Sequence, residues 1–398
     1  ILLIAGTSIG AGMLALPITT GSGGFYYALI LMLVCFGYML LSVFLLLEAN
    51  LYETNMDANI ISMSKRRLGV GGAAVGWISF LMLLYSVAAA YLSAGGSLVG
   101  QVLIGDKVLT HAEAHLTIIG FAIVFGVIVF FGAWLVDLIN RFLMIGLIAS
   151  YLVLALFVTP HVELSNLQFG QPKYLLAAFP IVLLSFTSHI IVPSLRIYMK
   201  NDVKQLKKAL LYGSLVPLIF YVLWEFLILG VLPMSGEYSL TAIAARAHPV
   251  SGLTHALNEH LGLLWVASVV GAFSFFALVT SFLGVILSLI DFLADGLQIT
   301  KNAWGRFRLL LLTLIPPLIF ALYFESGFML AISYAGVFVA ILYGILPPLM
   351  IWKARYSEHL TSEFRVPGGK PVLLFSIFGA VAVIILQVLA ELHYLPTP

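Results

Sequence analysis

The chain opens with the run Ile4-Ala5-Gly6-Thr7-Ser8-Ile9-Gly10-Ala11-Gly12-Met13-Leu14-Ala15-Leu16-Pro17, an apolar segment interrupted by three glycines and two hydroxyl residues. Inside a helix, glycine costs about 1 kcal/mol relative to alanine, and Thr and Ser offer the backbone competing hydrogen bonds. Gly6 and Gly10 alone would also fit a close helix-packing face. The third glycine and the hydroxyl pair favour a helix that is broken halfway.

Composition places this segment in a membrane. Of the 398 residues, 62% are hydrophobic and 9% are charged, against roughly 45–50% and about 25% in soluble domains. Only a bilayer can cover so much apolar surface. No basic patch with interleaved aromatic residues indicates nucleic acid, and no cofactor or obligatory protein partner is indicated. We therefore expect an integral membrane protein that contacts lipid and a small solute.

Apolar runs long enough to cross about 30 Å of hydrocarbon recur along the whole chain. None shows the period-two alternation of a membrane barrel, so the predicted fold class is all-α. The runs predict eleven transmembrane helices, at residues 1–19, 25–50, 70–104, 115–136, 141–160, 174–199, 209–232, 263–293, 308–324, 328–352 and 371–394.

The distribution of Lys and Arg predicts the orientation. With the N-terminus in the cytoplasm, all of the 19 basic residues except Lys107, Lys173 and Arg246 fall in inner loops, as the positive-inside rule requires. The C-terminus is then expected in the periplasm. Two connections are longer than turns: residues 53–68 form either an inner amphipathic helix or a solvated loop, and residues 235–262 hold two short helical patterns, either an outer lid or a passive connector.

The sixth apolar run carries a second interruption, Ser185-Phe186-Thr187-Ser188-His189-Ile190-Ile191-Val192-Pro193. It places polar side chains, an imidazole and a proline at membrane depth, where irregular backbone is tolerated only if it lines a cavity or is buried in protein. Two interrupted spans, five apart, are typical of inverted-repeat transporters. The pattern predicts two halves, 1–160 and 174–352, followed by an additional span at 371–394.

An interrupted helix frees peptide groups near the middle of the bilayer. The amides of Ser8 to Gly12 would hold a carboxylate, helped by the positive end of the outer half-helix. The freed carbonyls would bind an ammonium group or a metal cation, because glycine lets a ligand approach the backbone closely. A zwitterionic amino acid matches both ends. The predicted substrate site comprises Thr7, Ser8, Gly10, Ala11, Gly12, Tyr85, Phe186, Thr187, Ser188, His189 and Phe276.

Several motifs together resemble one family, the bacterial tyrosine and tryptophan permeases of the amino acid/auxin permease group in the APC superfamily. They are Ala5–Pro17, Leu46-Leu47-Glu48, Tyr85 with Ala89-Ala90-Tyr91, Leu135-Val136-Asp137 with Asn140-Arg141-Phe142, Val192-Pro193-Ser194 and Thr280-Ser281-Phe282-Leu283-Gly284. The resemblance covers nearly the whole chain. It implies the leucine-transporter fold, with five-plus-five inverted repeats, eleven helices and breaks in the first and sixth.

The same resemblance implies a symporter of the bacterial inner membrane that imports an aromatic amino acid by alternating access, tyrosine before tryptophan, and not an enzyme. Thr187, Ser188, Ile190 and Ile191 stand where the family carries glycines around its histidine, so the exact substrate stays open. An amino-acid sensor or a channel with the same fold is the alternative. A channel would need a continuous polar pore, and no polar stripe appears in the sequence.

The run Ala277-Leu278-Val279-Thr280-Ser281 resembles the sodium-site segment of leucine-transporter-fold symporters. In that comparison the carbonyls of Gly6, Ile9 and Ala277 and the hydroxyls of Thr280 and Ser281 surround the ion, all of them hard oxygen ligands. The alternative is that both hydroxyls bond back within their own helix. Leu147 stands where related permeases carry a lysine, which favours Na⁺ as the coupling ion, whereas the family's general habit favours H⁺.

A few polar residues of the spans have two interpretations each. His189 is either a proton carrier or a structural histidine, and Glu225 is either a hydrogen-bonded neutral acid or a proton site. Glu48, Asp291 and Asp295 either pair with basic residues as an inner gate or are solvated. Asp137 and Arg141, spaced i,i+4, are expected to pair.

Overall fold

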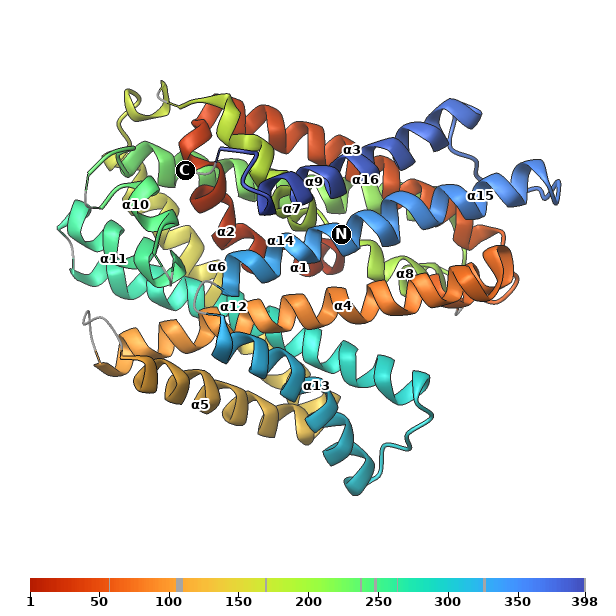
Figure 1. Cartoon of the computed structure of the whole chain (residues 1–398), viewed down its shortest axis with the longest axis horizontal. Coiled ribbons are helices and arrows are strands. Elements are labelled where there is room, and N and C mark those ends of the chain that lie inside the picture. Colours follow the sequence, from red (N-terminus) through yellow and green to blue (C-terminus); the bar gives the residue numbers. More distant parts are fainter. Residues whose placement is uncertain are drawn as a thin grey trace.

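The computed structural model describes residues 1–56, 58–104, 110–168, 170–236, 238–246, 249–262, 264–324 and 327–396, and in these ranges it contains helices and irregular connections but no strand. Most of the long helices run roughly along the longest axis of the molecule (Figure 1). The long helices are α3 (Phe25–Leu51), α4 (Ile60–Ile104), α5 (His111–Phe130), α6 (Ala133–Val158), α9 (Val203–Val231), α12 (Leu264–Gly296), α13 (Ala303–Tyr323) and α16 (Gly369–Glu391), of which α4 is kinked at Gly69.

Three further spans are assembled from shorter pieces. The first consists of α1 (Leu2–Ser8) and α2 (Ala11–Thr20), the sixth of α7 (Leu175–Ser185) and α8 (Val192–Tyr198), and the tenth of α14 (Gly327–Val339), a π-helical turn (Ala340–Ile345) and α15 (Leu346–Tyr356). Ten segments of the described ranges are long and apolar enough to cross a membrane. They confirm a multi-pass membrane protein, and the split first span, residues 2–20, accounts for the eleventh predicted crossing.

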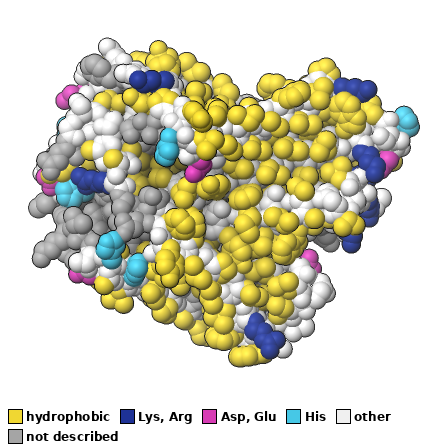
Figure 2. Space-filling view, viewed as in Figure 1, with side chains coloured by type: hydrophobic (Ala, Val, Ile, Leu, Met, Phe, Trp, Pro, Cys, Tyr) yellow, Lys and Arg dark blue, Asp and Glu magenta, His cyan; other side chains and the backbone are white. Residues whose placement is uncertain are grey.

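The surface divides as the bilayer requires. In Figure 2 hydrophobic side chains cover the middle of the visible face, and several Lys and Arg side chains gather at one end. We call the end of the bundle that carries Arg66, Arg67, Arg196 and Arg355 the basic end, because hydrogen bonds and ion pairs join these side chains to one acidic cluster. Lys107, one of the exceptions in the charge distribution, lies outside the described residues.

The inner helix predicted over residues 53–68 is present from Ile60 to Leu68. It begins after Asn59, whose side-chain oxygen accepts hydrogen bonds from the amides of Ile61 and Ser62 at 3.0 and 2.9 Å. It ends at Gly69, where φ is 76° and ψ is −161°, a conformation that favours glycine. The chain turns there and continues as the third membrane span.

Two short helices cover the end opposite the basic end, as the sequence predicted. They are α10 (Leu240–Ala244), which Ser239 caps, and α11 (Pro249–Leu261). Both pack against α2, and α11 also packs against α12 and α4. The sequence predicts the first of them over residues 240–247; the helix ends at Ala244, and residue 247 lies outside the described ranges.

Candidate functional site

The first break lies between α1 and α2, where Ile9 and Gly10 leave the helical conformation. Gly10 stands at the N-cap position of α2 but has no side chain that could cap the helix. Its carbonyl oxygen accepts one hydrogen bond, from the amide of Met13 at 3.0 Å. The first amides of α2 therefore have no partner within their helix. A β-carbon on Gly10 would lie 2.5 Å from Ser281 Oγ and 3.0 Å from the Tyr91 hydroxyl. The absence of a side chain brings α12 and α4 against the opened backbone.

The second break follows Ser185, the last residue of α7. Phe186, Thr187 and Ser188 are not helical, a short 3₁₀ turn covers His189–Ile191, and α8 begins with Pro193 in its first turn. Proline is tolerated there because its missing amide would have had no helical partner. Both interruptions predicted from the sequence are therefore confirmed.

The two breaks face each other in the middle of the bundle, where α2 packs against α7 (Figure 1). A β-carbon on Gly12 would lie 2.5 Å from Ser185 Oγ and 3.1 Å from the Ser185 α-carbon. Only glycine allows this approach without moving a backbone. The N-terminal amides of one half-helix and the C-terminal carbonyls of another are thus held side by side.

Tyr221 of α9 joins the two breaks. Its hydroxyl is 2.6 Å from the carbonyl oxygen of Ser8 and 2.9 Å from that of Ser185, and the whole side chain is buried. These are the terminal carbonyls of α1 and α7, at the negative ends of both helix dipoles. One hydroxyl proton serves two acceptors, so the pair has room for a further donor such as an ammonium group. Tyr221 was not identified from the sequence, because its hydrogen-bond partners are distant in the chain.

Several predicted substrate residues gather at these breaks. Ser8, Gly10 and Gly12 form the first, and Phe186, Thr187 and Ser188 form the second. The Phe186 ring packs edge-on against Tyr221, with ring centroids 5.3 Å apart. The Thr187 hydroxyl is buried and has no hydrogen-bond partner. Thr187 is therefore free to bind a polar group of a ligand.

Other predicted residues point elsewhere or are not described. The exposed Thr7 bonds back to the carbonyl of Ile4 at 2.8 Å. Tyr85 donates its hydroxyl to the Leu312 carbonyl of α13 at 2.7 Å, away from the breaks. Phe276 packs on Gly146 of α6. Ala11 begins α2, but its side chain lies outside what is described. Tyr91, on the same helix as Tyr85, is the tyrosine that reaches the first break.

His189 is held on the basic-end side of the second break. Its Nε2 lies 3.0 Å from Ser42 Oγ, and its ring stacks on Tyr343 with centroids 4.4 Å apart. Ser42 donates its only proton to the Tyr343 carbonyl at 2.6 Å, so Nε2 must be the protonated nitrogen. Nδ1 is then a buried acceptor, and it has no partner. The π-helical turn at Tyr343 frees the carbonyl that fixes this tautomer.

The predicted ion ligands form two close pairs of oxygens. Ser281 Oγ lies 3.5 Å from the Ile9 carbonyl across the break, and Thr280 Oγ1 donates to the Ala277 carbonyl of its own helix at 3.1 Å. Thr280 thus makes the internal bond expected of the alternative interpretation, whereas Ser281 reaches the first break. A β-carbon on Gly6 would lie 3.9 Å from the terminal carbon of Met144 on α6. In the described ranges no three His, Cys, Asp or Glu side chains converge as a transition-metal site.

Two cavities lie on opposite sides of the breaks. One, of about 560 Å³, opens away from the basic end between α4, α11 and α12, and Phe275 and Phe276 form part of its wall. The other, of about 80 Å³, lies toward the basic end and is lined by His189, Tyr343 and Pro193, among others. The larger space is therefore on the side opposite the basic residues.

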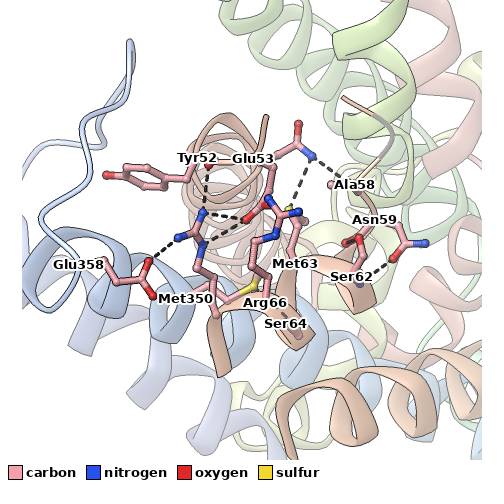
Figure 3. Close-up of polar contacts among 12 residues, drawn as sticks. Tyr52, Glu53, Ala58, Asn59, Ser62, Met63, Ser64, Arg66, Met350 and Glu358 are labelled. Carbon is pink, nitrogen blue, oxygen red and sulfur yellow. Dashed lines mark hydrogen bonds and ion pairs between the residues drawn. The ribbon is translucent and has the colours of Figure 1, made fainter. Parts of the chain in front are cut away.

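Buried charges close the basic end. Glu53 at the end of α3 pairs with Arg66 at 2.8 Å and with Arg67 at 3.0 Å, and Arg67 also pairs with Glu358 beyond α15 (Figure 3). Arg196 of α8 donates to the Glu53 carbonyl at 3.1 Å. The network ties together the ends of α3, α8 and α15 and the short helix 60–68.

A second buried pair lies next to this network. Glu48 is fully buried and accepts from Arg355 Nε at 2.6 Å, from the Val366 amide at 2.8 Å and from the Tyr52 hydroxyl at 3.0 Å. Of the three acids considered for an inner gate, only Glu48 is in a buried pair. Asp291 pairs with Lys301 at the surface, and Asp295 is exposed. Asp137 and Arg141 form the expected exposed pair at 2.6 Å.

Comparisons with known proteins agree with this geometry. The sequence profile of the tryptophan/tyrosine permease family matches residues 1–387. Tyrosine-specific transport system 2 of Haemophilus influenzae is 34% identical over 399 residues, covering 99% of this chain and 97% of that protein. The tryptophan-specific transport protein of Pseudomonas aeruginosa is 32% identical over 401 residues, covering 99% and 95%.

Among solved structures, that of MhsT in complex with L-phenylalanine matches with a TM-score of 0.63 over 97% of both chains, at 12% sequence identity. A likeness at this identity shows the fold. The predicted leucine-transporter fold is confirmed.

Proposed function

This chain belongs to the tryptophan/tyrosine permease family, whose members are transporters rather than enzymes, and from this premise we propose that it is a secondary active symporter that imports an aromatic amino acid. Tyrosine is the preferred substrate and tryptophan the second. The transport is by alternating access across the bacterial inner membrane, with the N-terminus and the basic end in the cytoplasm.

The observation that carries the proposal is the pair of facing breaks joined by Tyr221. The free amides at the start of α2 suit the substrate carboxylate, and the terminal carbonyls of α1 and α7 suit its ammonium group. Phe186 offers an aromatic wall next to both. The carboxylate, the ammonium group and the ring of an aromatic amino acid thus each find a partner near the two breaks.

The closed basic end and the larger opposite cavity support a conformation that is shut toward the cytoplasm. Movement of the interrupted spans relative to the remaining helices would break the network around Glu53 and open the small cavity beside His189. The two halves, 1–160 and 174–352, would move as the two repeats of the transport cycle, with the span at 371–394 outside them.

Uptake into proteoliposomes tests the function. With labelled tyrosine, tryptophan and leucine and separately imposed Na⁺ and H⁺ gradients, we expect saturable accumulation of tyrosine, competition by tryptophan and little effect of leucine. Flux that never exceeds the external concentration would instead indicate a channel. Binding without flux would indicate a sensor.

The coupling ion is Na⁺ in preference to H⁺, because Ser281 reaches the Ile9 carbonyl and the buried Leu147 leaves no lysine beside them. Replacing Thr280 and Ser281 with alanine should weaken the Na⁺ stimulation of substrate binding by roughly tenfold or more, the usual size of a lost pair of cation ligands. Titration of substrate binding against NaCl measures it. Thr117→Ala is the matched control, because Thr117 bonds only to the Ala114 carbonyl of its own helix at 3.0 Å. Equal Na⁺ dependence in both variants would remove the sodium assignment.

Removing the hydroxyl of Tyr221 tests the ammonium site. In Tyr221→Phe the ring remains but two buried carbonyls lose their donor, at a cost of about 1–3 kcal/mol. Substrate affinity, measured by binding to the purified protein, should fall roughly 5- to 150-fold. Tyr151→Phe is the control: its side chain is also buried, 4% exposed against 0% for Tyr221, and its hydroxyl donates to the Phe220 carbonyl at 3.0 Å, away from the breaks. If both variants lose the same affinity, Tyr221 has only a structural role.

A further inference from the structure

One buried acid in the membrane has no role in the function proposed above. Glu225 lies on α9, one helical turn beyond Tyr221, and its side chain is fully buried. Its Oε1 contacts the hydroxyl of Thr20, the last residue of α2, and its Oε2 has no hydrogen-bond partner. None of the ion pairs in the described ranges includes it. An isolated carboxylate in such a place costs several kcal/mol.

The position of Thr20 shows how the acid is accommodated. The Thr20 hydroxyl also lies 2.7 Å from the Leu16 carbonyl of its own helix. A hydroxyl has one proton, so Thr20 donates either to the Leu16 carbonyl or to Glu225 Oε1. If it donates to Leu16, only a protonated Glu225 can bond to it; if it donates to Glu225, an ionised carboxylate has this one hydrogen bond and none at Oε2. The geometry therefore satisfies a neutral acid better than an ionised one.

Among the residues that the structure describes, no neighbouring group supplies a charge to take the place of that proton. The helices α1 and α2 contain no titratable side chain. Near this part of α9, the hydroxyls of Tyr151 and Tyr221 are both occupied by carbonyls. At the outer rim the exposed Glu163 meets α9 only through its backbone amide, which donates to the Gly230 carbonyl at 2.9 Å, and His161 is exposed. On α3, packed against α9, Tyr26 and Tyr27 are exposed and Cys35 is buried.

The helix α2 connects this acid to the substrate site. It is ten residues long, with the amides proposed for the substrate carboxylate at its first turn and Thr20 at its last. Both contacts belong to one short helix, so a displacement of the whole of α2 would change the substrate contact at its start and the Glu225 contact at its end. Packing of α2 against α9 buries Glu225, and separation would admit water.

We propose that Glu225 is a proton-binding site linked to substrate binding through α2. When substrate draws α2 into the packed position, one proton passes from water to the Glu225 carboxylate and forms the neutral acid. When substrate leaves and α2 separates, the acid returns that proton to water and the carboxylate is hydrated. The inference rests on the proposed function, because the substrate site is placed at the start of α2, and it holds whichever ion drives transport.

Linkage fixes the sign of the pH effect. A hydrated glutamic acid is ionised at neutral pH, so substrate binding at pH 7 takes up about one proton and substrate affinity falls about tenfold for each unit of rising pH. In Glu225→Gln the side chain is permanently neutral and has nearly the same shape. Its affinity should not vary with pH, and it should take up no proton.

Calorimetry measures the proton directly. Tyrosine is titrated into the purified full-length protein in buffers of different ionisation enthalpy, which gives the number of protons bound per substrate. Wild type and Glu163→Gln, in which an exposed acid is removed, should take up about one proton, and Glu225→Gln none. Uptake of no proton by the wild type would overturn the proposal, even if Glu225→Gln did not fold. Equal proton uptake by Glu225→Gln and wild type would also overturn it. Failure of any aromatic amino acid to bind would contradict the proposed function instead.

Discussion

Replacing Gly12 with alanine should abolish most substrate accumulation. The added methyl group would lie 2.5 Å from Ser185 Oγ and 3.1 Å from the Ser185 α-carbon, so a side chain and a backbone must both move. Overpacking of this kind costs about 1–3 kcal/mol, which corresponds to a loss of affinity of roughly 5- to 150-fold. Because the contact joins α2 to α7, the overpacking energy opposes the close approach of the two breaks. Binding and uptake of labelled tyrosine measure the effect.

Two further variants make this prediction specific. Gly37→Ala adds the same methyl group to α3, where nothing lies within 4 Å, and should transport normally. In the double variant Gly12→Ala, Ser185→Ala the clash with Oγ is removed, although the contacts at 3.1 Å remain, so part of the activity should return. Normal uptake by Gly12→Ala would show that α2 and α7 need not approach so closely.

Replacing Arg355 with methionine should destabilise the protein more than any other substitution proposed for the basic end. The change leaves Glu48 buried with the Tyr52 hydroxyl and the Val366 amide but without a counter-charge. Removing one partner of a buried pair costs about 3–5 kcal/mol, because the other charge remains away from water. We expect a lower free energy of unfolding in detergent. We also expect faster amide hydrogen exchange in residues 48–68, because the contacts that close the basic end would be lost there.

The surface pair Lys301–Asp291 is the matched comparison. Its side chains are 48% and 58% exposed, and exposed pairs contribute about 0–1 kcal/mol, so Lys301→Met should be nearly neutral. Adding Glu48→Gln to Arg355→Met removes the orphaned charge and should recover much of the lost stability. If Arg355→Met is no more destabilising than Lys301→Met, the buried pair does not hold the basic end closed.

The sequence alone determined the membrane class, the crossings and both interruptions. These features are local: a run of apolar residues must lie in lipid whatever surrounds it, and Gly6 to Gly12 weaken a helix by their own backbone preferences. For residues 53–68 the sequence left a helix and a loop both open; the structure has a helix there, which Asn59 caps at its start and which ends at the positive φ of Gly69. Local signals of this kind need no knowledge of the partner helices.

Only the tertiary structure decided which side chains meet at the breaks. Tyr221 reaches carbonyls 213 and 36 residues away, and Glu48 pairs with an arginine 307 residues away. On one helix, α4, Tyr91 faces the first break whereas Tyr85 turns to α13, and no local pattern distinguishes the two tyrosines. The π-helical turn at Ala340–Ile345 was also not visible in the sequence, because its freed carbonyls are satisfied by Ser42 and Ser376 of other helices. Residues such as glycine, serine and threonine break a helix through their own backbone preferences. The side chains that meet at a break depend instead on how distant helices pack.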